Sequence, residues 1–169
     1  PEVRKDVEAG LAKTVKENYP EAEVLMGTST AGIAHAAITA EILDMPMGYV
    51  RGSNKDHGRQ NRIEGRLEKG QKVVVIEDLI STGGSVIEVV DALRDAGAEV
   101  LGIASIFTYG MEKGKKRLAE AKVKNISLTD FDCIASVAAE EGYIRKEDIE
   151  RLIAFRNNPS DESWIGGAK

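Results

Sequence analysis

The chain of 169 residues is 42% hydrophobic and 30% charged, which is ordinary for one globular domain with a sizeable core. Its formal net charge of −5 argues against a nucleic-acid-binding surface, because binding to phosphate backbones requires an excess of basic groups. The single cysteine, Cys133, excludes an internal disulfide and a cysteine-built zinc site, and we expect it to be a small buried hydrophobic residue. No apolar stretch approaches the length of a membrane span, so we expect a cytoplasmic protein that does not bind membranes.

Helical and strand patterns alternate along the chain. Apolar residues four apart, from Val3 to Val15, predict a first helix that ends near Tyr19. Strands separated by helices of ordinary length indicate right-handed crossovers, so the pattern predicts an α/β fold. We expect residues 1–169 to form a single domain with a Rossmann-like, doubly wound parallel sheet flanked by helices. The later elements are predicted as strand 24–26, helix 32–43, strand 47–50, strand 72–77, helix 84–96, strand 100–107, helix 112–121, strand 126–128 and helices 130–140 and 146–155.

The most apolar segment of the chain is followed directly by two acids. The run from Val73 to Ile76 consists of β-branched residues and predicts a central strand that is covered on both faces. Glu77 and Asp78 come next, at the carboxyl end of the strand, where open α/β sheets bind ligands. Because a buried and unpaired carboxylate is costly, these two acids predict a partner such as sugar hydroxyls or a metal ion.

A turn rich in hydroxyls and glycine follows the acids and opens the next helix. Unpaired backbone N–H groups and the positive helix end converge there, which suits a phosphate dianion. The glycines allow the backbone to approach a ligand closely, and the hydroxyls add donors. Together with the acids, the turn predicts a site for ribose 5-phosphate; the alternative is a capped helix start beside two solvated acids. Its residues are Ser81, Thr82, Gly83, Gly84 and Ser85.

The longest segment without a helix or strand pattern is basic. We expect residues 51–63 to be a flexible loop over an anionic ligand, because long loops inside compact domains are often lids. Its basic residues would donate to a leaving pyrophosphate, whose negative charge grows in the transition state. A solvated basic loop is the alternative. The donors are Arg51, Lys55, His57 and Arg59. Gly58, between the last two, would serve as a pivot when the loop closes and reopens.

A second turn between a strand and a helix could also bind phosphate. Thr28, Ser29, Thr30 and Ala31 follow the strand at 24–26, and backbone N–H groups can meet an anion there. Taken alone, this segment indicates an ordinary turn in which Thr30 caps the helix. We interpret His35, in the same helix, as a core or interface histidine without a visible partner.

These motifs together resemble the type I phosphoribosyltransferases, and within them the orotate phosphoribosyltransferases. The segment 73–85 is similar to the family's motif for phosphoribosyl pyrophosphate (PRPP), and 28–31 resembles its pyrophosphate loop. The pattern Arg-x-x-x-Lys-x-His-Gly at 51–58 resembles the catalytic loop. Relatives that act on 6-oxopurines usually carry an acid at the position of Ser81, so the hydroxyl favours orotate or adenine as the base.

The resemblance implies an activity and a set of partners. PRPP and orotate would give orotidine 5′-monophosphate and pyrophosphate on the route to UMP, with Mg²⁺ bound mainly through PRPP. Arg51 would contact pyrophosphate, Lys55 and His57 would be catalytic, and Glu77 and the catalytic Asp78 would hold the ribose hydroxyls. The 81–85 turn would anchor the 5-phosphate. The family further implies a homodimer in which loop 51–63 reaches the neighbouring site.

The sequence departs from the family pattern in several places. Gly52 stands where many relatives have another basic residue, and Ala31 where some have lysine. Because the sequence begins at Pro1, we expect the N-terminal hood over the base to be absent, which would leave PRPP binding intact and reduce turnover. Residues 160–169 are expected to be a disordered or engineered tail. The open alternatives are an inactive or regulatory PRPP-binding domain and an adenine phosphoribosyltransferase.

Overall fold

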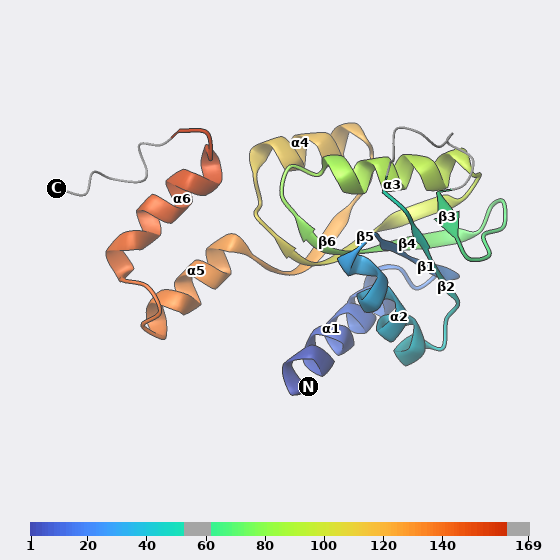
Figure 1. The fold of residues 1–169 in the computed structure, drawn as a ribbon, viewed down its shortest axis with the longest axis horizontal. Coiled ribbons are helices and arrows are strands. Elements are labelled where there is room, and N and C mark those ends of the chain that lie inside the picture. Colours follow the sequence, from blue (N-terminus) through green and yellow to red (C-terminus); the bar gives the residue numbers. More distant parts are fainter. Residues whose placement is uncertain (53–61, 162–169) are drawn as a thin grey trace.

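The computed structural model describes residues 1–52 and 62–161, in which helices flank a six-stranded sheet (Figure 1). No helix in these ranges is long and apolar enough to cross a membrane. The elements are α1 (Glu2–Asn18), β1 (Val24–Thr28), α2 (Ala31–Leu43), β2 (Met47–Val50), β3 (Ile63–Glu64), β4 (Lys72–Ile80), α3 (Gly84–Asp95), β5 (Glu99–Thr108), α4 (Glu112–Glu120), β6 (Asn125–Asp130), α5 (Phe131–Glu140), η2 (Lys146–Asp148) and α6 (Ile149–Asn157).

The sheet confirms the predicted fold class and adds an antiparallel edge. Its strand order is β3-β2-β1-β4-β5-β6, so β1 and β4 lie side by side at the centre although β2 and β3 separate them in sequence. All neighbouring strands are parallel except β3, which pairs antiparallel with β2. This two-residue strand is too short to produce a pattern that the sequence alone would reveal.

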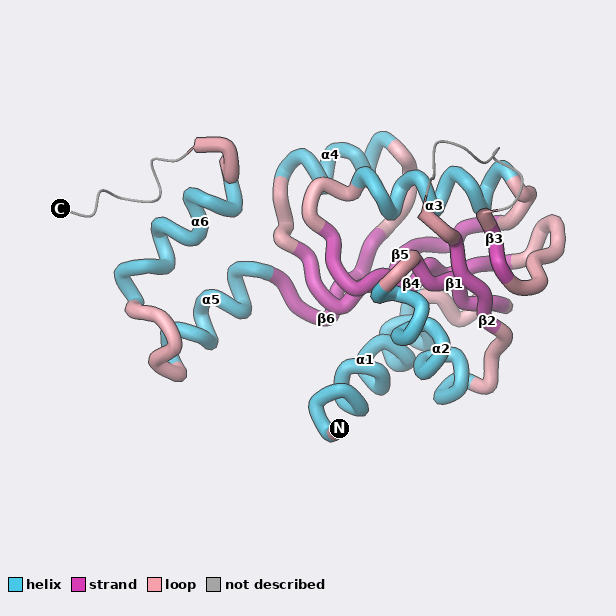
Figure 2. Tube along the Cα trace, in the orientation of Figure 1, coloured by secondary structure: helices cyan, strands magenta, loops and turns pink. Residues whose placement is uncertain are grey.

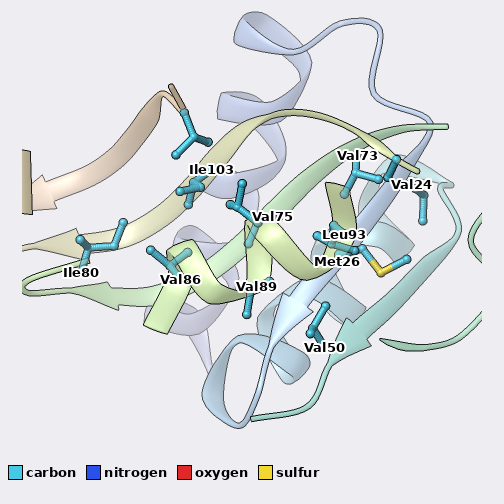
Figure 3. Packing of buried hydrophobic residues seen from close by; sticks show 13 residues of the cluster. Val24, Met26, Val50, Val73, Val75, Ile80, Val86, Val89, Leu93 and Ile103 are labelled. Atoms are coloured by element: carbon cyan, nitrogen blue, oxygen red, sulfur yellow. The ribbon is translucent and has the colours of Figure 1, made fainter. Parts of the chain in front are cut away.

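Helices cover both faces of the sheet, as Figures 1 and 2 show. On one face, α3 packs on Val73 and Val75 of β4, and Figure 3 shows this cluster from close by. On the other face, Leu11 of α1 and residues of α2 pack on Val74 and Ile76. Successive side chains of β4 therefore enter opposite cores, which is why the run is apolar without alternation. The buried stripe of α3 consists of Val86, Val89, Val90 and Leu93.

β4 is longer than predicted, and this changes where its acids lie. Glu77 pairs with Ser105, and the pairing with β5 continues to Ile80 and Thr108. The two acids are therefore part of the strand near its carboxyl end, whereas the prediction ended the strand at residue 77. The longer strand arises because β5 also continues to Thr108, and a paired neighbour satisfies the backbone N–H and C=O groups of the extra residues.

The last two helices form a hairpin beyond the edge strand β6 (Figure 2). Aromatic rings connect this hairpin to the end of β5: Tyr109 stacks on Phe131 at a centroid distance of 5.6 Å, and Phe131 contacts Phe155 at 6.5 Å. The expectation for Cys133 was wrong, because this residue of α5 is exposed. α5 buries only one side, and Cys133 lies outside the stripe formed by Ala135 and Ala139.

Candidate active site

The carboxyl ends of β1 and β4 meet at a cavity of about 650 Å³. Gly27 of β1 pairs with Ile76 of β4, so the residues that follow them in each strand lie next to each other. The β1–α2 turn and the β4–α3 turn therefore border one space, as expected for the ligand-binding edge of a parallel sheet. The cavity is lined by residues that include Thr28, Ser29, Glu77, Asp78, Ser85 and Arg117.

Glu77 is the buried acid of this cavity. Its side chain is 5% exposed. The Thr28 hydroxyl donates a hydrogen bond of 2.6 Å to Oε1, and the Asp78 backbone N–H donates one of 3.0 Å to the same atom. Burial, reinforced by the side chain of Asp78, raises the pKa of Glu77 to about 8. The raised pKa favours the protonated form of Glu77 in the protein without ligand.

Asp78 occupies a different environment from its neighbour. It is half-buried and lines the same cavity, so its carboxylate can accept hydrogen bonds from a ligand. The sequence treated Glu77 and Asp78 as an equivalent pair. The structure instead places a buried acid, which accepts a hydrogen bond from Thr28 and whose pKa is raised by burial, beside a more accessible acid. Only the three-dimensional environment reveals this asymmetry.

The turn from residue 81 to residue 85 has the predicted geometry. Gly83 is the N-cap of α3 and has a φ of 75°, a backbone conformation that favours glycine. In the described chain no side chain caps α3, so the N–H groups of its first turn are available to an anion. Ser85, in that first turn, is exposed and lines the cavity.

The β1–α2 turn lies on the opposite side of Glu77. Ser29, Thr30 and Ala31 are exposed, and Ser29 lines the cavity. Thr30 is the N-cap of α2, as predicted, but its side chain makes no capping hydrogen bond. Gly32 is buried behind the turn, where a Cβ would lie 2.7 Å from the carbonyl oxygen of Ile76. The glycine thus lets α2 start directly against β4.

Part of the predicted catalytic loop can be placed. Arg51 is exposed, and its Nε lies 3.2 Å from Glu64 Oε1 of β3. Its backbone N–H donates to the carbonyl oxygen of Arg62, which closes the base of the loop at 2.7 Å. Two of the predicted catalytic residues, Lys55 and His57, lie outside the described residues, as do Gly58 and Arg59 and the end of the tail from residue 162.

Sequence reasoning missed two arginines that line the cavity, Arg62 and Arg117. Arg62 Nε donates to the Arg51 carbonyl oxygen at 3.1 Å, and its Nη2 lies 3.9 Å from Glu88. Arg117 comes from α4, more than 30 residues beyond the nearest predicted site residue. The sequence signal for it is Gly114, because a glycine inside a helical pattern has a packing or functional reason.

The interpretation of His35 as a histidine without a partner was wrong. Its Nδ1 lies 2.7 Å from Oε1 of Glu8, which is 1% exposed, and Thr39 donates a hydrogen bond of 3.3 Å to Oε2 of the same acid. Glu8 belongs to α1 and His35 to α2, so the contact joins two helices whose residues are 27 apart in sequence. The prediction that His35 lies in the core or at an interface is confirmed, because it lies between α1 and α2.

The donors at the cavity suit a magnesium ion that is bound mainly by a ligand. Within residues 1–52 and 62–161, no group of three or more His, Cys, Asp or Glu side chains could hold a metal ion. The oxygen donors that border the cavity include hydroxyls and the carboxyl groups of Glu77, Asp78 and Glu88. Mg²⁺ prefers such oxygens and usually keeps water or phosphate ligands.

Comparisons with known proteins agree with this geometry. A model of the phosphoribosyl transferase domain matches residues 1–141. The orotate phosphoribosyltransferase of Bacillus cereus strain G9842 is 55% identical over 165 residues, which are 98% of this chain and 79% of that protein. The chain belongs to the orotate phosphoribosyltransferases. It is therefore an enzyme of the phosphoribosyltransferase class, as the motifs predicted.

Solved structures show the same fold. The orotate phosphoribosyltransferase of Aeropyrum pernix has a TM-score of 0.72 and 27% identity, with 83% of this chain and 76% of that chain covered. The UMP synthase of Leishmania donovani has a TM-score of 0.78 and 23% identity, and the match covers 91% of this chain and 33% of that chain. The second likeness shows the fold alone.

Proposed function

We propose that this enzyme transfers the phosphoribosyl group of PRPP to orotate, which gives orotidine 5′-monophosphate and pyrophosphate in UMP biosynthesis. The observation that carries the proposal is the single cavity that Glu77, Asp78 and the first turn of α3 line together. The acids suit a ribose, and the turn suits its phosphate. The 55% identity to an enzyme named orotate phosphoribosyltransferase favours orotate over adenine as the base, and an active enzyme over a regulatory domain.

The two acids would stabilise the ribose during the reaction. As the bond from the anomeric carbon to pyrophosphate breaks, positive charge develops on the ring and negative charge on the leaving group. Asp78 accepts hydrogen bonds from the ribose hydroxyls, and its carboxylate favours the cationic ring. Glu77, buried beside Asp78 in the same cavity, adds a second carboxyl group for the ribose hydroxyls. Positioning and electrostatics therefore supply the catalysis, and no covalent nucleophile is needed.

The remaining site residues would bind the two phosphate ends of PRPP. The turn of Ser81, Thr82, Gly83, Gly84 and Ser85 holds the 5-phosphate through its amides and hydroxyls. On the other side of Glu77, the segment 28–31 meets the pyrophosphate. Arg51 contacts the pyrophosphate too, and Lys55 and His57 stabilise its growing charge as it leaves.

A magnesium ion would be held mainly by PRPP and water, with the carboxylate of Asp78 among the nearby oxygens. When bound, it neutralises charge on the pyrophosphate and so makes it a better leaving group. The protein's own residues still orient the ribose and bind the 5-phosphate. Asp78 in particular holds the 2- and 3-hydroxyls of the ribose, next to the anomeric carbon that reacts.

We extend the proposal to the setting of the enzyme. It acts in the cytoplasm as a homodimer in which the catalytic loop 51–63 of one subunit reaches the neighbouring site, and residues 1–169 form one phosphoribosyltransferase domain. The match of the domain model to residues 1–141 supports the last point. The homodimer and the location in the cell are inferences from the family.

Pyrophosphate release tests the proposed reaction directly. The purified protein with PRPP and Mg²⁺ should release pyrophosphate with orotate and not with adenine, and orotidine 5′-monophosphate should accumulate. Lys55→Ala should lower turnover by roughly 100-fold or more, with little change in PRPP binding measured by calorimetry. Adenine-dependent release would overturn the choice of base, and PRPP binding without turnover on any base would indicate a regulatory domain.

A further inference from the structure

Arg117 lies against the turn that precedes α3. Its Nη1 donates hydrogen bonds of 3.3 Å to the backbone carbonyl oxygen and to the hydroxyl of Thr82. It also lies beside Gly84, because a Cβ built there would be 3.3 Å from Nη1. The same residue lines the cavity together with Glu77 and Asp78. Arg117 thus joins the predicted phosphate turn to the predicted ribose site.

Close packing of α4 fixes this position. A Cβ on Gly114 would lie 2.6 Å from the carbonyl oxygen of Ser81, so a side chain there would push the helix away from the turn. Residues three apart share one face of a helix, and Arg117 therefore follows Gly114 toward the turn. The glycine determines how near the guanidinium can come to Thr82.

The charge of Arg117 is not neutralised by the described part of the chain. No carboxylate there lies within ion-pair distance of it, whereas Arg62, the other arginine at the cavity, has Glu88 at 3.9 Å. A guanidinium has five N–H donors. The described residues offer acceptors to Nη1 alone, so Nε and Nη2 can still donate to a ligand.

The predicted ligand requires such a charge. A phosphate monoester carries a charge near −2 at neutral pH, and residues 81–85 contain no basic side chain. A helix N-terminus contributes only about half a positive charge. Guanidinium groups suit phosphate because two parallel N–H groups can bind two of its oxygens. A cation from outside the turn would therefore complete the site.

We infer that Arg117 contacts the 5-phosphate of PRPP and of the nucleotide product. This inference rests on the proposed function and adds a residue from α4 to its phosphate site. Arg117 supplies the positive charge that the turn lacks, while its bonds to Thr82 hold the turn in the shape that receives the phosphate. It contributes to binding and does not touch the bond that breaks.

Binding of ribose 5-phosphate tests the role of Arg117. Calorimetry should show that Arg117→Gln weakens binding by roughly 10- to 100-fold, and that Arg117→Lys recovers part of it. In ³¹P NMR titrations of the bound sugar, the wild type should hold the phosphate as a dianion to lower pH than free ribose 5-phosphate. Arg117→Gln should reduce this pKa shift, because a nearby cation favours the dianion. A purely structural role would leave the shift unchanged.

Arg94 provides the matched control. Its guanidinium also donates to backbone carbonyl oxygens, those of Ala121 and Lys122, but Arg94 does not line the cavity. Arg94→Gln should therefore bind ribose 5-phosphate as the wild type does. Equal binding and an equal phosphate pKa in wild type and Arg117→Gln would overturn the inference. If the wild type binds ribose 5-phosphate yet forms no nucleotide, the proposed function fails and the assignment of Arg117 remains.

Discussion

The Thr28 hydroxyl donates a hydrogen bond of 2.6 Å to Oε1 of Glu77, across the boundary between β1 and β4. Thr28 is the last residue of β1, and it is followed directly by the turn that we assign to pyrophosphate. Glu77 belongs to the pair of acids that we assign to the ribose. One buried hydrogen bond therefore fixes the relative position of the two halves of the site.

Removing this hydroxyl should destabilise the protein. Thr28→Val keeps the shape of the side chain but leaves Glu77 without its side-chain donor. We therefore expect the free energy of unfolding to fall by about 1–3 kcal/mol. Urea unfolding measures the change. Thr14→Val is the control, because Thr14 is also buried and makes no side-chain hydrogen bond within the described chain. An equal fall in the free energy of unfolding in the two variants would show that the hydrogen bond from Thr28 to Glu77 does not stabilise the protein.

The raised pKa of Glu77 predicts a dependence of stability on pH. The pKa is about 8 in the folded protein and 4.5 in the unfolded chain, so the folded state binds more protons between these values. Stability from this group is complete below pH 4.5 and is lost as the pH rises through 8. Relative to Glu77→Gln, the wild type should lose up to about 1.4 kcal/mol per pH unit in this window. Parallel unfolding curves for the two proteins from pH 5 to pH 8 would refute the shift.

The contact between α1 and α2 should be energetically coupled. Glu8 is buried, so removing its partner with His35→Ala leaves a carboxyl group with one fewer hydrogen bond. A double-mutant cycle with Glu8→Gln and His35→Ala should give a coupling of about 1–3 kcal/mol. The exposed pair Lys13 and Glu17, 3.9 Å apart, serves as the comparison and should give less than about 0.5 kcal/mol. Similar values for both cycles would argue against a structural role for His35.

Gly32, behind the β1–α2 turn, and Gly52, at the cavity, should respond differently to alanine. Gly32→Ala would place a Cβ 2.7 Å from the Ile76 carbonyl oxygen and also against Thr28, so α2 must shift and stability should fall by about 1–3 kcal/mol. Among the described residues, a Cβ on Gly52 would meet only Ser29 Oγ, at an ordinary 3.8 Å, so we expect Gly52→Ala to be tolerated. Thermal unfolding and pyrophosphate release can be compared in the two variants. A stable, fully active Gly32→Ala would show that the turn does not require this close packing.

The sequence predicted the central parts of the fold because their patterns are local. The apolar run at 73–76 is followed by acids and a glycine turn, and each part has its own physical signature over a few residues. The family resemblance then named the enzyme class correctly. The limits of β4 could not be predicted, since the strand extends to Ile80 only because β5 continues beside it.

Features that depend on contacts between distant residues were missed. Nothing near His35 in the sequence indicates Glu8, and nothing near Thr82 indicates Arg117, because packing of separate helices creates both contacts. The exposure of Cys133 likewise depends on which side of α5 faces its neighbours. Glu77 differs from Asp78 because it is buried and accepts a hydrogen bond from Thr28, 49 residues away in the sequence. Local patterns identify the elements of the site but not the contacts that connect them.

The adjacency of β1 and β4 also bears on the synthesis of this protein. Val24 pairs with Val73, so β1 must wait for a partner that is translated much later. Parallel pairing over such a separation is slow, because a long segment must be ordered before any contact forms. Until then the edge of β1 that pairs with β4, and the side chains of Val24 and Met26 that pack with α3, stay open to chaperones or to other nascent chains. The candidate site can therefore assemble only after β4 and the turn that follows it have been translated.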